Sequence, residues 1–409
     1  MGICLGKTTT SRSPWPDLPP DLAALIISRL PSHRDRLSFG AVCRDWRLAA
    51  RQELPPAMPC ISLGRGAYQS IADGKVFRSS HGADVTSFGS YLLYKHRRRL
   101  FLRDSSSTIE IPRDHHECAD ECSDRGAHDP CGSKRTWPLI PAEGVAFTMR
   151  KVLVCSSSLL VAILNRDAGR PGSAYCLVFF RPGTGQLSWV LLLTTNMYGS
   201  KYGYKYRDIA LYRGKIFALK SSEQLFTHEI GQPCCVEQVI KDPTPLPPGI
   251  DPSSPSFLVK HYMVVSSDNR KLLMVRWNIP HAAYVHHSKI NLQVFEADLE
   301  KRQWLEVNDL DGQLLFLSRT CSRALAVSST EHYGQTFRGN RVFILGTDWA
   351  RIRRRLNPCT CHDCEKLGNG VPSYCVYDMT SGKLSLVHYA KVVEREIQVQ
   401  NGSSPPGEN

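Results

Sequence analysis

The chain has 409 residues, of which 42% are hydrophobic and 22% charged, a composition ordinary for a globular protein with a sizeable core. Its 51 lysines and arginines outnumber its 38 acidic residues, and the net charge of +13 permits anionic partners without establishing them. No apolar run is long enough for a transmembrane helix and none resembles a secretory signal, so we expect no membrane partner. The 15 cysteines are therefore predicted to be reduced, in the cytoplasm or the nucleus.

Residues 1–14 are polar and are predicted to be disordered, whereas residues 15–54 carry a helical pattern. We expect a helix to begin at Pro19 and Pro20, because the missing N–H of proline costs nothing in the first turn. Apolar residues then recur at helical spacing, at Leu22, Leu25, Ile26 and Leu30.

Pro31 ends this first helix in the prediction. Ser32 followed by Asp35 fits a capping box that opens a second helical stretch. Gly40 is predicted to mark a break between two short helices.

Two motifs lie at the ends of this stretch, L-P-P-D-L at 18–22 and V-C-R-D-W at 42–46, with an L-P pair at 30–31 between them. In this order and spacing they resemble an F-box. The resemblance implies three helices that bind the Skp-type adaptor of a cullin–RING ubiquitin ligase. The residues it implies as adaptor contacts, or as their direct support, are Leu18, Pro19, Leu22, Ile26, Leu30, Pro31 and Val42. Trp46 fits the core of the module as well as a contact, and periodicity alone leaves open a helical hairpin packed on the rest of the chain.

From residue 60 to about 390 the pattern changes to short apolar segments separated by turn residues, which predicts an all-β domain. A scheme of strand, polar turn and strand recurs at 182–189, 298–304 and 378–386. Gly214 and Gly339 are each predicted to form a tight hairpin turn. Repeated units of this kind favour a six- or seven-bladed β-propeller, with long loops near 113–136 and 351–370. Residues 391–409 are expected to be a strand end and a disordered tail.

The C-terminal part also resembles a known family, through Trp304 and the segments 315–319, 338–343 and 374–378. It is similar to the KIB-type β-propeller domain, which follows an F-box in a large plant family. The resemblance implies a propeller that presents loops to a protein substrate.

Two clusters are rich in metal-ligand residue types, one at 114–131 and one at 359–364. Cys118 and Cys122 have a spacing that a zinc knuckle can use, but neither cluster has a full two-pair zinc signature. We therefore favour polar loops that happen to hold Cys and His, and predict no metal and no cofactor. The motifs of hydrolases, nucleotide-binding loops and zinc proteases are also missing, so no catalytic residue is predicted.

The basic runs at 95–99 and 351–355 could bind nucleic acid, but the first is better explained as a charged hairpin tip between two strands. No RNA-binding or helix-turn-helix signature accompanies them, so no nucleic-acid partner is predicted. Tyr198, Tyr202, Tyr204 and Tyr206 could touch a partner, although their alternation favours a strand with one packed face.

The prediction is a non-enzymatic substrate-recognition subunit of a Skp–cullin–F-box ubiquitin ligase, which holds the adaptor through residues 15–54 and an unknown protein substrate through the propeller. The alternative is a propeller scaffold that acts outside any ligase, with the helices as a packed cap. A propeller enzyme with a metal in its loops is a third class, which would require bound zinc.

Overall fold

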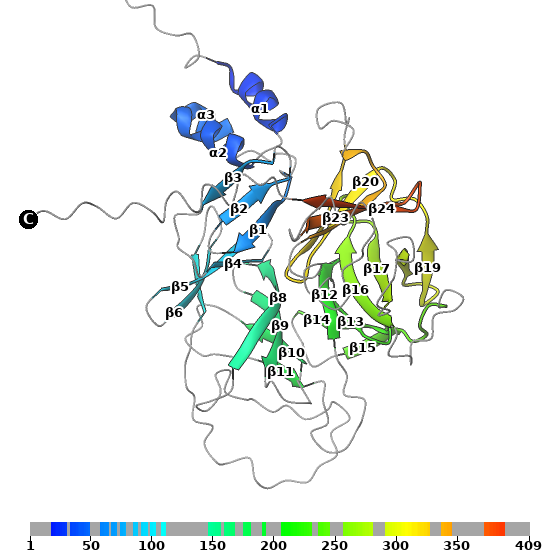
Figure 1. Ribbon diagram of the computed structural model, residues 1–409. Helices are drawn as coiled ribbons and strands as arrows, with labels where there is room; N and C mark the ends of the chain where they lie inside the picture. The colour runs from blue at the N-terminus through cyan, green and yellow to red at the C-terminus, as the bar shows by residue number, and fades with distance from the viewer. Residues whose placement is uncertain are drawn as a thin grey trace, which may run out of the picture.

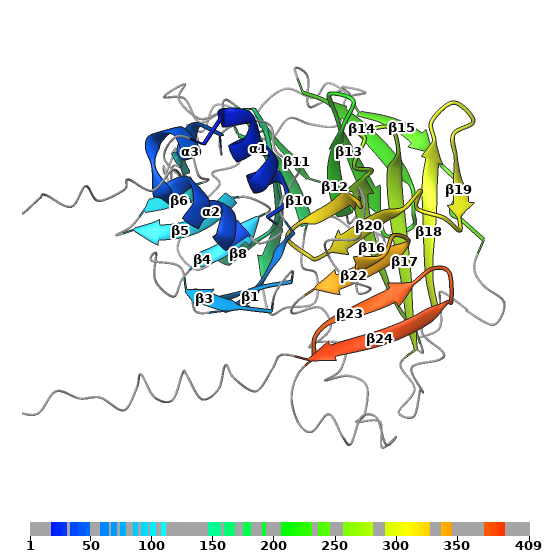
Figure 2. The same cartoon turned by 90° about the horizontal axis from the view of Figure 1, so that it is seen from above.

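A computed structural model describes the chain in segments, which are residues 18–30, 33–49, 58–64, 67–71, 74–78, 85–88, 91–96, 99–103, 108–111, 146–156, 159–167, 175–180, 190–193, 206–230, 236–245, 257–280, 291–327, 337–345 and 372–388. Three short helices lie together at one end, next to the first strands, and every later element is a strand (Figure 1). Figure 2 shows the chain from above, with the three helices in front of the first strands. Within the described residues, no helix has the length and apolar character needed to cross a membrane.

The helices are α1 (Pro20–Ser28), α2 (His33–Val42) and α3 (Arg44–Ala49). Helix α1 begins where the prolines predict, with Pro20 in its first turn and Pro19 as the preceding cap residue. The predicted break at Gly40 is wrong, because α2 continues through it to Val42. The helices separate at Cys43, whose Sγ accepts the backbone N–H of Trp46 at 3.4 Å and so takes the place of a capping oxygen.

The described strands form six sheets. Four of these are four-stranded, one is three-stranded and one is five-stranded, and the number of blades stays a prediction. The first three sheets comprise β1 (Cys60–Gly64), β2 (Ala67–Ser70) and β3 (Val76–Arg78); β4 (Val85–Phe88), β5 (Tyr91–His96), β6 (Arg99–Arg103) and β7 (Thr108–Ile111); and β8 (Ala146–Ser156), β9 (Leu159–Asp167), β10 (Tyr175–Phe180) and β11 (Val190–Leu193).

The other three sheets comprise β12 (Tyr206–Tyr212), β13 (Lys215–Lys220), β14 (Leu225–Glu229) and β15 (Val236–Ile240); β16 (Phe257–Val265), β17 (Leu272–Pro280), β18 (Asn291–Asp298) and β19 (Gln303–Val307); and β20 (Gln313–Leu317), β21 (Ser322–Ala326), β22 (Arg341–Leu345), β23 (Pro372–Asp378) and β24 (Lys383–His388). The first five sheets are antiparallel meanders in chain order. The last has the order β21-β20-β22-β23-β24, with β20 and β22 parallel.

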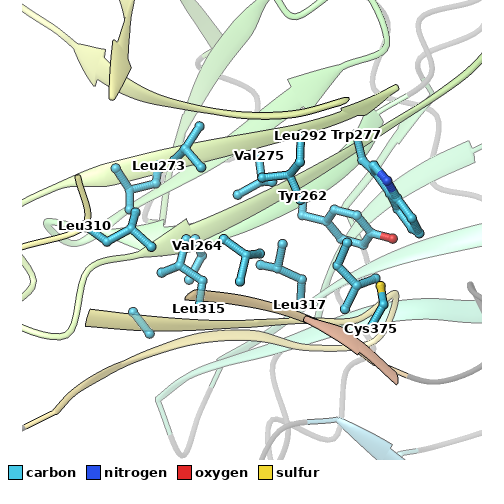
Figure 3. Packing of buried hydrophobic residues seen from close by; sticks show 14 residues of the cluster. Tyr262, Val264, Leu273, Val275, Trp277, Leu292, Leu310, Leu315, Leu317 and Cys375 are labelled. Atoms are coloured by element: carbon cyan, nitrogen blue, oxygen red, sulfur yellow. The ribbon is translucent and has the colours of Figure 1, made fainter. Parts of the chain in front are cut away.

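The sheets pack face to face, as expected for a β-propeller. Strand β8 contacts β4 and β12, and strand β16 contacts β12 and β21, so one end strand of each of these sheets lines a common interior. Between neighbouring sheets lie apolar clusters. One joins the fifth and sixth sheets through residues such as Val264, Trp277 and Leu315 (Figure 3). Another joins the last sheet to the first, through Met58 and Ile61, and so brings the two ends of the sheet domain together.

Two of the predicted repeat turns share one local chemistry. Asp298 Oδ1 accepts the backbone N–H groups of Glu300 and Lys301, at 3.2 and 2.9 Å. Asp378 Oδ1 accepts the equivalent groups two and three residues later, at 3.1 and 3.0 Å. Each aspartate thus closes the turn between the last two strands of its sheet, as a side chain that mimics a backbone turn. The third repeat, at 182–189, lies outside the described residues.

The two predicted glycine hairpins have different outcomes. Arg213 and Gly214 join β12 to β13 with φ of 47° and 71°, the positive pair that a two-residue hairpin needs. The hairpin predicted at Gly339 is wrong, because β22 pairs with the distant strand β20. A Cβ at Gly339 would lie 2.6 Å from the Gly312 Cα, so the glycine is needed for close contact between two segments.

A buried carboxylate at Asp208 ties three sheets together. Its Oδ1 lies 2.6 Å from the Lys151 ammonium of β8 and accepts the Ile209 N–H at 2.8 Å. Its Oδ2 accepts the backbone N–H of Met263 in β16 at 2.7 Å. A buried charge is tolerated only when it is paired and hydrogen-bonded, and both oxygens here meet that condition.

A second buried network surrounds Glu223, in the turn between β13 and β14. Its carboxylate lies 3.1 Å from the fully buried Arg276 guanidinium and 3.0 Å from His261 Nε2, and it accepts the backbone N–H of Thr244 at 2.9 Å. Trp304 Nε1 donates to the Glu223 backbone carbonyl at 2.8 Å. Burial opposes ionisation of the carboxyl, but hydrogen bonds from His261 and Thr244 and the charges of His261 and Arg276 outweigh it and lower its pKa to about 2.

Candidate functional site

The three helices share a very small core. Ala23 and Ile27 of α1 pack against Phe39 of α2 and Ala49 of α3, and all four are buried. Trp46 stacks on Phe39 with ring centroids 4.3 Å apart, so the tryptophan belongs to this core. A core of this size holds little apolar surface, and the helical module (α1–α3) therefore has little stability of its own.

A neighbouring side of α1 is apolar and open to solvent. Three large side chains on that face, which we call the apolar stripe, are Leu22 (49% exposed), Leu25 (48%) and Ile26 (38%). Residues three and four apart lie on one side of a helix, so these three form a continuous surface. Elsewhere in the module, Val42 of α2 (60% exposed) and Leu48 of α3 (51%) are also large exposed apolar side chains. An exposed apolar concentration of this kind marks an interaction surface.

Polar contacts from arginines hold the helices in register beneath this surface. Arg36 Nε of α2 donates to the Leu30 carbonyl, just after α1, at 2.7 Å. Arg47 Nε of α3 donates to the Gly40 carbonyl at 3.1 Å. Both bonds reach backbone carbonyls at or near helix ends, groups that would otherwise lack intrahelical partners.

The residues predicted as adaptor contacts fall into two groups. Leu22, Ile26 and Val42 are exposed and available to a partner. Leu18 and Leu30 are half-buried against the core of the module, where they can support the surface from beneath. Pro19 is exposed and its carbonyl accepts the Ala23 N–H at 3.0 Å, while Pro31 lies outside the described residues.

Two exposed residues were not among the predicted contacts. Leu25 belongs to the apolar period of α1, and its place next to Leu22 and Ile26 is the signal that could have identified it. Leu48 lies in α3 beyond the V-C-R-D-W motif, and the six residues of that helix are too few for a period to show which side faces solvent.

A cavity of about 660 Å³ lies where the helical module meets the sheet domain. Ser28 and Arg29, at the end of α1, contribute to its wall together with Met58. The rest of the described lining comes from β8, β12, β16 and its following turn, β20 and β21. The cavity is therefore bounded by several sheets and by the end of the helix that carries the apolar stripe.

Several predicted features fall on residues that the structure does not describe. These are both Cys- and His-rich clusters, the basic run at 351–355, and Tyr198, Tyr202 and Tyr204. The run at 95–99 does form a hairpin between β5 and β6, with His96 paired to Arg99, as predicted. Tyr206 is buried in β12 and its hydroxyl lies 3.2 Å from His228 Nε2, which is the packed position that the alternation favours.

Five cysteines of the described part of the chain are free thiols, namely Cys43, Cys60, Cys155, Cys321 and Cys375. Burial raises the pKa of Cys155 and of Cys375 to about 12. A thiol with so high a pKa is a poor nucleophile, and these two act as small apolar side chains.

Comparison with family models gives two matches. Residues 15–54 match the model described as F-box-like, and residues 68–378 match the model described as KIB1-4 beta-propeller. An F-box with a β-propeller is an architecture typical of non-catalytic adaptor proteins, and an F-box-like domain implies binding to a Skp-type adaptor in general. A search of curated proteins found no match.

Solved structures resemble the chain weakly. The beta-propeller domain of Cps50 (Swd1) from Myceliophteria thermophila is 11% identical, with 82% of this chain and 87% of that chain covered and a TM-score of 0.31. A Saccharomyces cerevisiae structure of Dbp5 bound to Nup159, Gle1, IP6 and ADP is 10% identical, with coverage of 84% and 80% and a TM-score of 0.27. The assignment of the fold rests instead on the packed sheets and on the family match.

Proposed function

Because the chain belongs to the KIB1-4 beta-propeller family and carries an F-box-like domain before it, we propose that it is the substrate-recognition subunit of a Skp–cullin–F-box ubiquitin ligase. It would act in the cytoplasm or the nucleus. The observation that carries the proposal is the apolar stripe of α1, which lies within the F-box-like segment and is left 38–49% exposed by the described residues.

The energetics of the stripe support docking onto a partner. Complete burial of one leucine or isoleucine side chain contributes roughly 1.5–3 kcal/mol, and the three residues of the stripe are only half-buried in the free chain. An amphipathic helix laid into an apolar groove is a common way to recognise a partner, with anchors spaced as Leu22, Leu25 and Ile26 are. Association restricts motion, so only part of this gain would appear as affinity.

The mechanism needs no acid, base or nucleophile from this chain. The helical module would hold the adaptor and the sheet domain would hold a protein substrate, so that the substrate lies near the ubiquitin-loaded component. Holding two reactants together raises their effective concentration, which is the contribution expected of a recognition subunit. The buried carboxylates of Asp208 and Glu223 are engaged in hydrogen bonds and ion pairs that hold the sheets together, which agrees with a non-catalytic role.

Co-purification tests the proposal. The intact chain, co-expressed with a Skp-type adaptor, is expected to elute with it as one complex of equal stoichiometry. A known F-box protein, purified in parallel, is the positive control. If that protein retains the adaptor and this chain does not, the proposed function is wrong.

One observation favours the alternative role of a scaffold outside any ligase. Ser28, Arg29 and Met58 share a cavity with the sheet strands, which is what a packed cap would do. Deletion of residues 1–54 separates the two roles. Loss of a cap would lower the urea midpoint of the sheet domain, whereas loss of an F-box would leave that midpoint unchanged and abolish binding to the adaptor.

A further inference from the structure

We propose that the cavity beside α1 binds an anionic segment of the substrate protein, one that carries phosphate or clustered carboxylates, with Arg29 and Arg323 as its charge partners. This inference rests on the proposed function, because it names the class of substrate that the receptor would take.

The described wall of the cavity is positively charged. Arg29 and Arg323 both line the cavity and both are exposed. Among the described residues neither guanidinium makes a salt bridge, and no Asp or Glu contributes to the described lining. Lys151 also lines the cavity, but Asp208 neutralises its charge at 2.6 Å. Two arginines without an ion-pair partner among the described residues therefore line the cavity, and guanidinium is the side-chain group best suited to carboxylate and phosphate.

A hydroxyl on the same wall lacks a partner. Ser322 Oγ is buried and has no hydrogen-bond partner among the described residues, and Ser322 lines the cavity next to Arg323 in β21. A buried polar group left unsatisfied is costly, so such a group marks a place where a ligand can supply the missing bond. An oxygen of a bound segment could accept that hydroxyl proton, while the guanidiniums contact another part of the same segment.

The size and the remaining lining favour a peptide segment over a lone ion. A volume of about 660 Å³ falls in the range that holds a drug-sized ligand, well above one phosphate. Met58, Leu153 and Val327 provide apolar wall beside the arginines. We therefore expect the segment to carry an apolar residue close to its anionic group.

The position of Arg29 links this cavity to the adaptor. Arg29 follows α1 directly and lies seven positions after Leu22, which corresponds to roughly 10 Å along a helix axis. A segment bound at Arg29 would thus lie close to the adaptor that covers the apolar stripe. Substrate and adaptor would then share one helix, which fixes the substrate relative to the rest of the ligase.

Degenerate peptide libraries test the inference on the purified full-length chain. Four fluorescein-labelled undecapeptide libraries would be used, with Glu, phosphoserine, Gln or Ser fixed at the centre. The chain is expected to retain the phosphoserine or the Glu library at least about fivefold better than its neutral counterpart, since a bond to a charged group contributes more than a neutral one. Retention should fall as salt is raised. Equal retention of charged and neutral libraries would overturn the proposal.

Substitutions locate the binding. Arg323→Gln and Arg29→Gln should each reduce the charged-library retention at least about fivefold, while Lys241→Gln, an exposed lysine outside the cavity lining, should not. Urea unfolding of each variant shows whether it is folded. If the arginine variants are folded and retain the library as the wild type does, the cavity is not the site. A preference for phosphoserine over Glu, or the reverse, identifies the anion.

Binding to the adaptor is measured separately, so the two proposals can fail independently. Arg323→Gln lies in the sheet domain and is expected to retain the adaptor while it loses the anionic library. If wild-type chain retains the charged library but no adaptor, the proposed ligase role fails and the anion site stands. If it retains the adaptor but no charged library, the ligase role stands and the anion site fails.

Discussion

The helical module and the sheet domain use apolar side chains in opposite ways. Of the seven large apolar residues that the described part of the chain leaves exposed, five lie in the helices and two, Val236 and Leu305, lie in the sheets. The sheets bury their apolar residues in clusters between neighbours and also bury ion pairs. We therefore expect the sheet domain to fold as an independent unit and the helical module to depend on a partner to cover its apolar side chains.

The largest expected effect concerns the buried ion pair of the sheet domain. Arg276→Met should lower the free energy of unfolding by about 3–5 kcal/mol, because it leaves the Glu223 carboxylate buried without its guanidinium partner. Urea unfolding followed by tryptophan fluorescence measures this loss. Arg302→Met is the matched control, since its ion pair with Glu237 is exposed and contributes at most about 1 kcal/mol. Equal effects of the two substitutions would contradict the structural role of the buried network.

The same network predicts how stability depends on pH. The pKa of Glu223 is about 2 in the folded chain and 4.5 ordinarily, so its contribution is complete above about pH 4.5 and is lost as the pH falls towards 2. The free energies of unfolding of wild type and Glu223→Gln should thus differ by a few kcal/mol at pH 6, and the difference should shrink steadily as the pH falls from about 4.5 towards 2. Urea titrations at several pH values measure the difference. A difference that stays constant over this range would exclude ionisation of Glu223 as its cause.

The smallest expected effect is the loss of stability when one buried methyl group is removed from the helical module or from the sheet domain. Ile27→Val and Ile216→Val each remove a methyl group from a fully buried position, and each should cost about 0.5–1.5 kcal/mol. For Ile216→Val the cost should appear as a lower urea midpoint of the sheet domain. For Ile27→Val it should appear as faster amide hydrogen exchange in residues 20–49, with that midpoint unchanged. If Ile27→Val shifts the midpoint as Ile216→Val does, the two regions unfold as one unit.

Local chemistry accounts for what the sequence could predict. The proline start of α1, the Arg213–Gly214 hairpin and the turns at Asp298 and Asp378 each depend on residues within a few positions of one another. The recurrence of such turns predicted a repeated β domain. The match to the KIB1-4 beta-propeller model confirms that this domain is a propeller. The prediction of a helix break at Gly40 was wrong because a single glycine weakens a helix without ending it when its neighbours pack. Phe39, the residue before it, is buried in the core of the helical module.

Features that depend on distant residues could not be predicted. The Arg338–Gly339 pair resembled the Arg213–Gly214 hairpin and was predicted to form a second one. Gly339 instead packs closely against Gly312, and β22 pairs in parallel with β20. Glu223 and Arg276 lie 53 positions apart, and no local pattern connects them. The helical period marked Leu22, Leu25 and Ile26 of α1 equally, yet the core uses Ala23 and Ile27 of that helix, so only the packed structure shows which side is exposed.

The most direct test of the account compares two exposed leucines, one in each region. Leu22 in α1 and Leu305 in β19 have similar exposure, at 49% and 41%, so an aspartate at either position should be tolerated by the fold. Binding of each purified variant to a Skp-type adaptor would be measured by isothermal titration calorimetry. The account predicts that Leu22→Asp weakens binding at least about tenfold, because a charge replaces buried apolar surface, and that Leu305→Asp binds as the wild type does. Equal binding by both variants would contradict the assignment of the α1 apolar stripe as the docking surface.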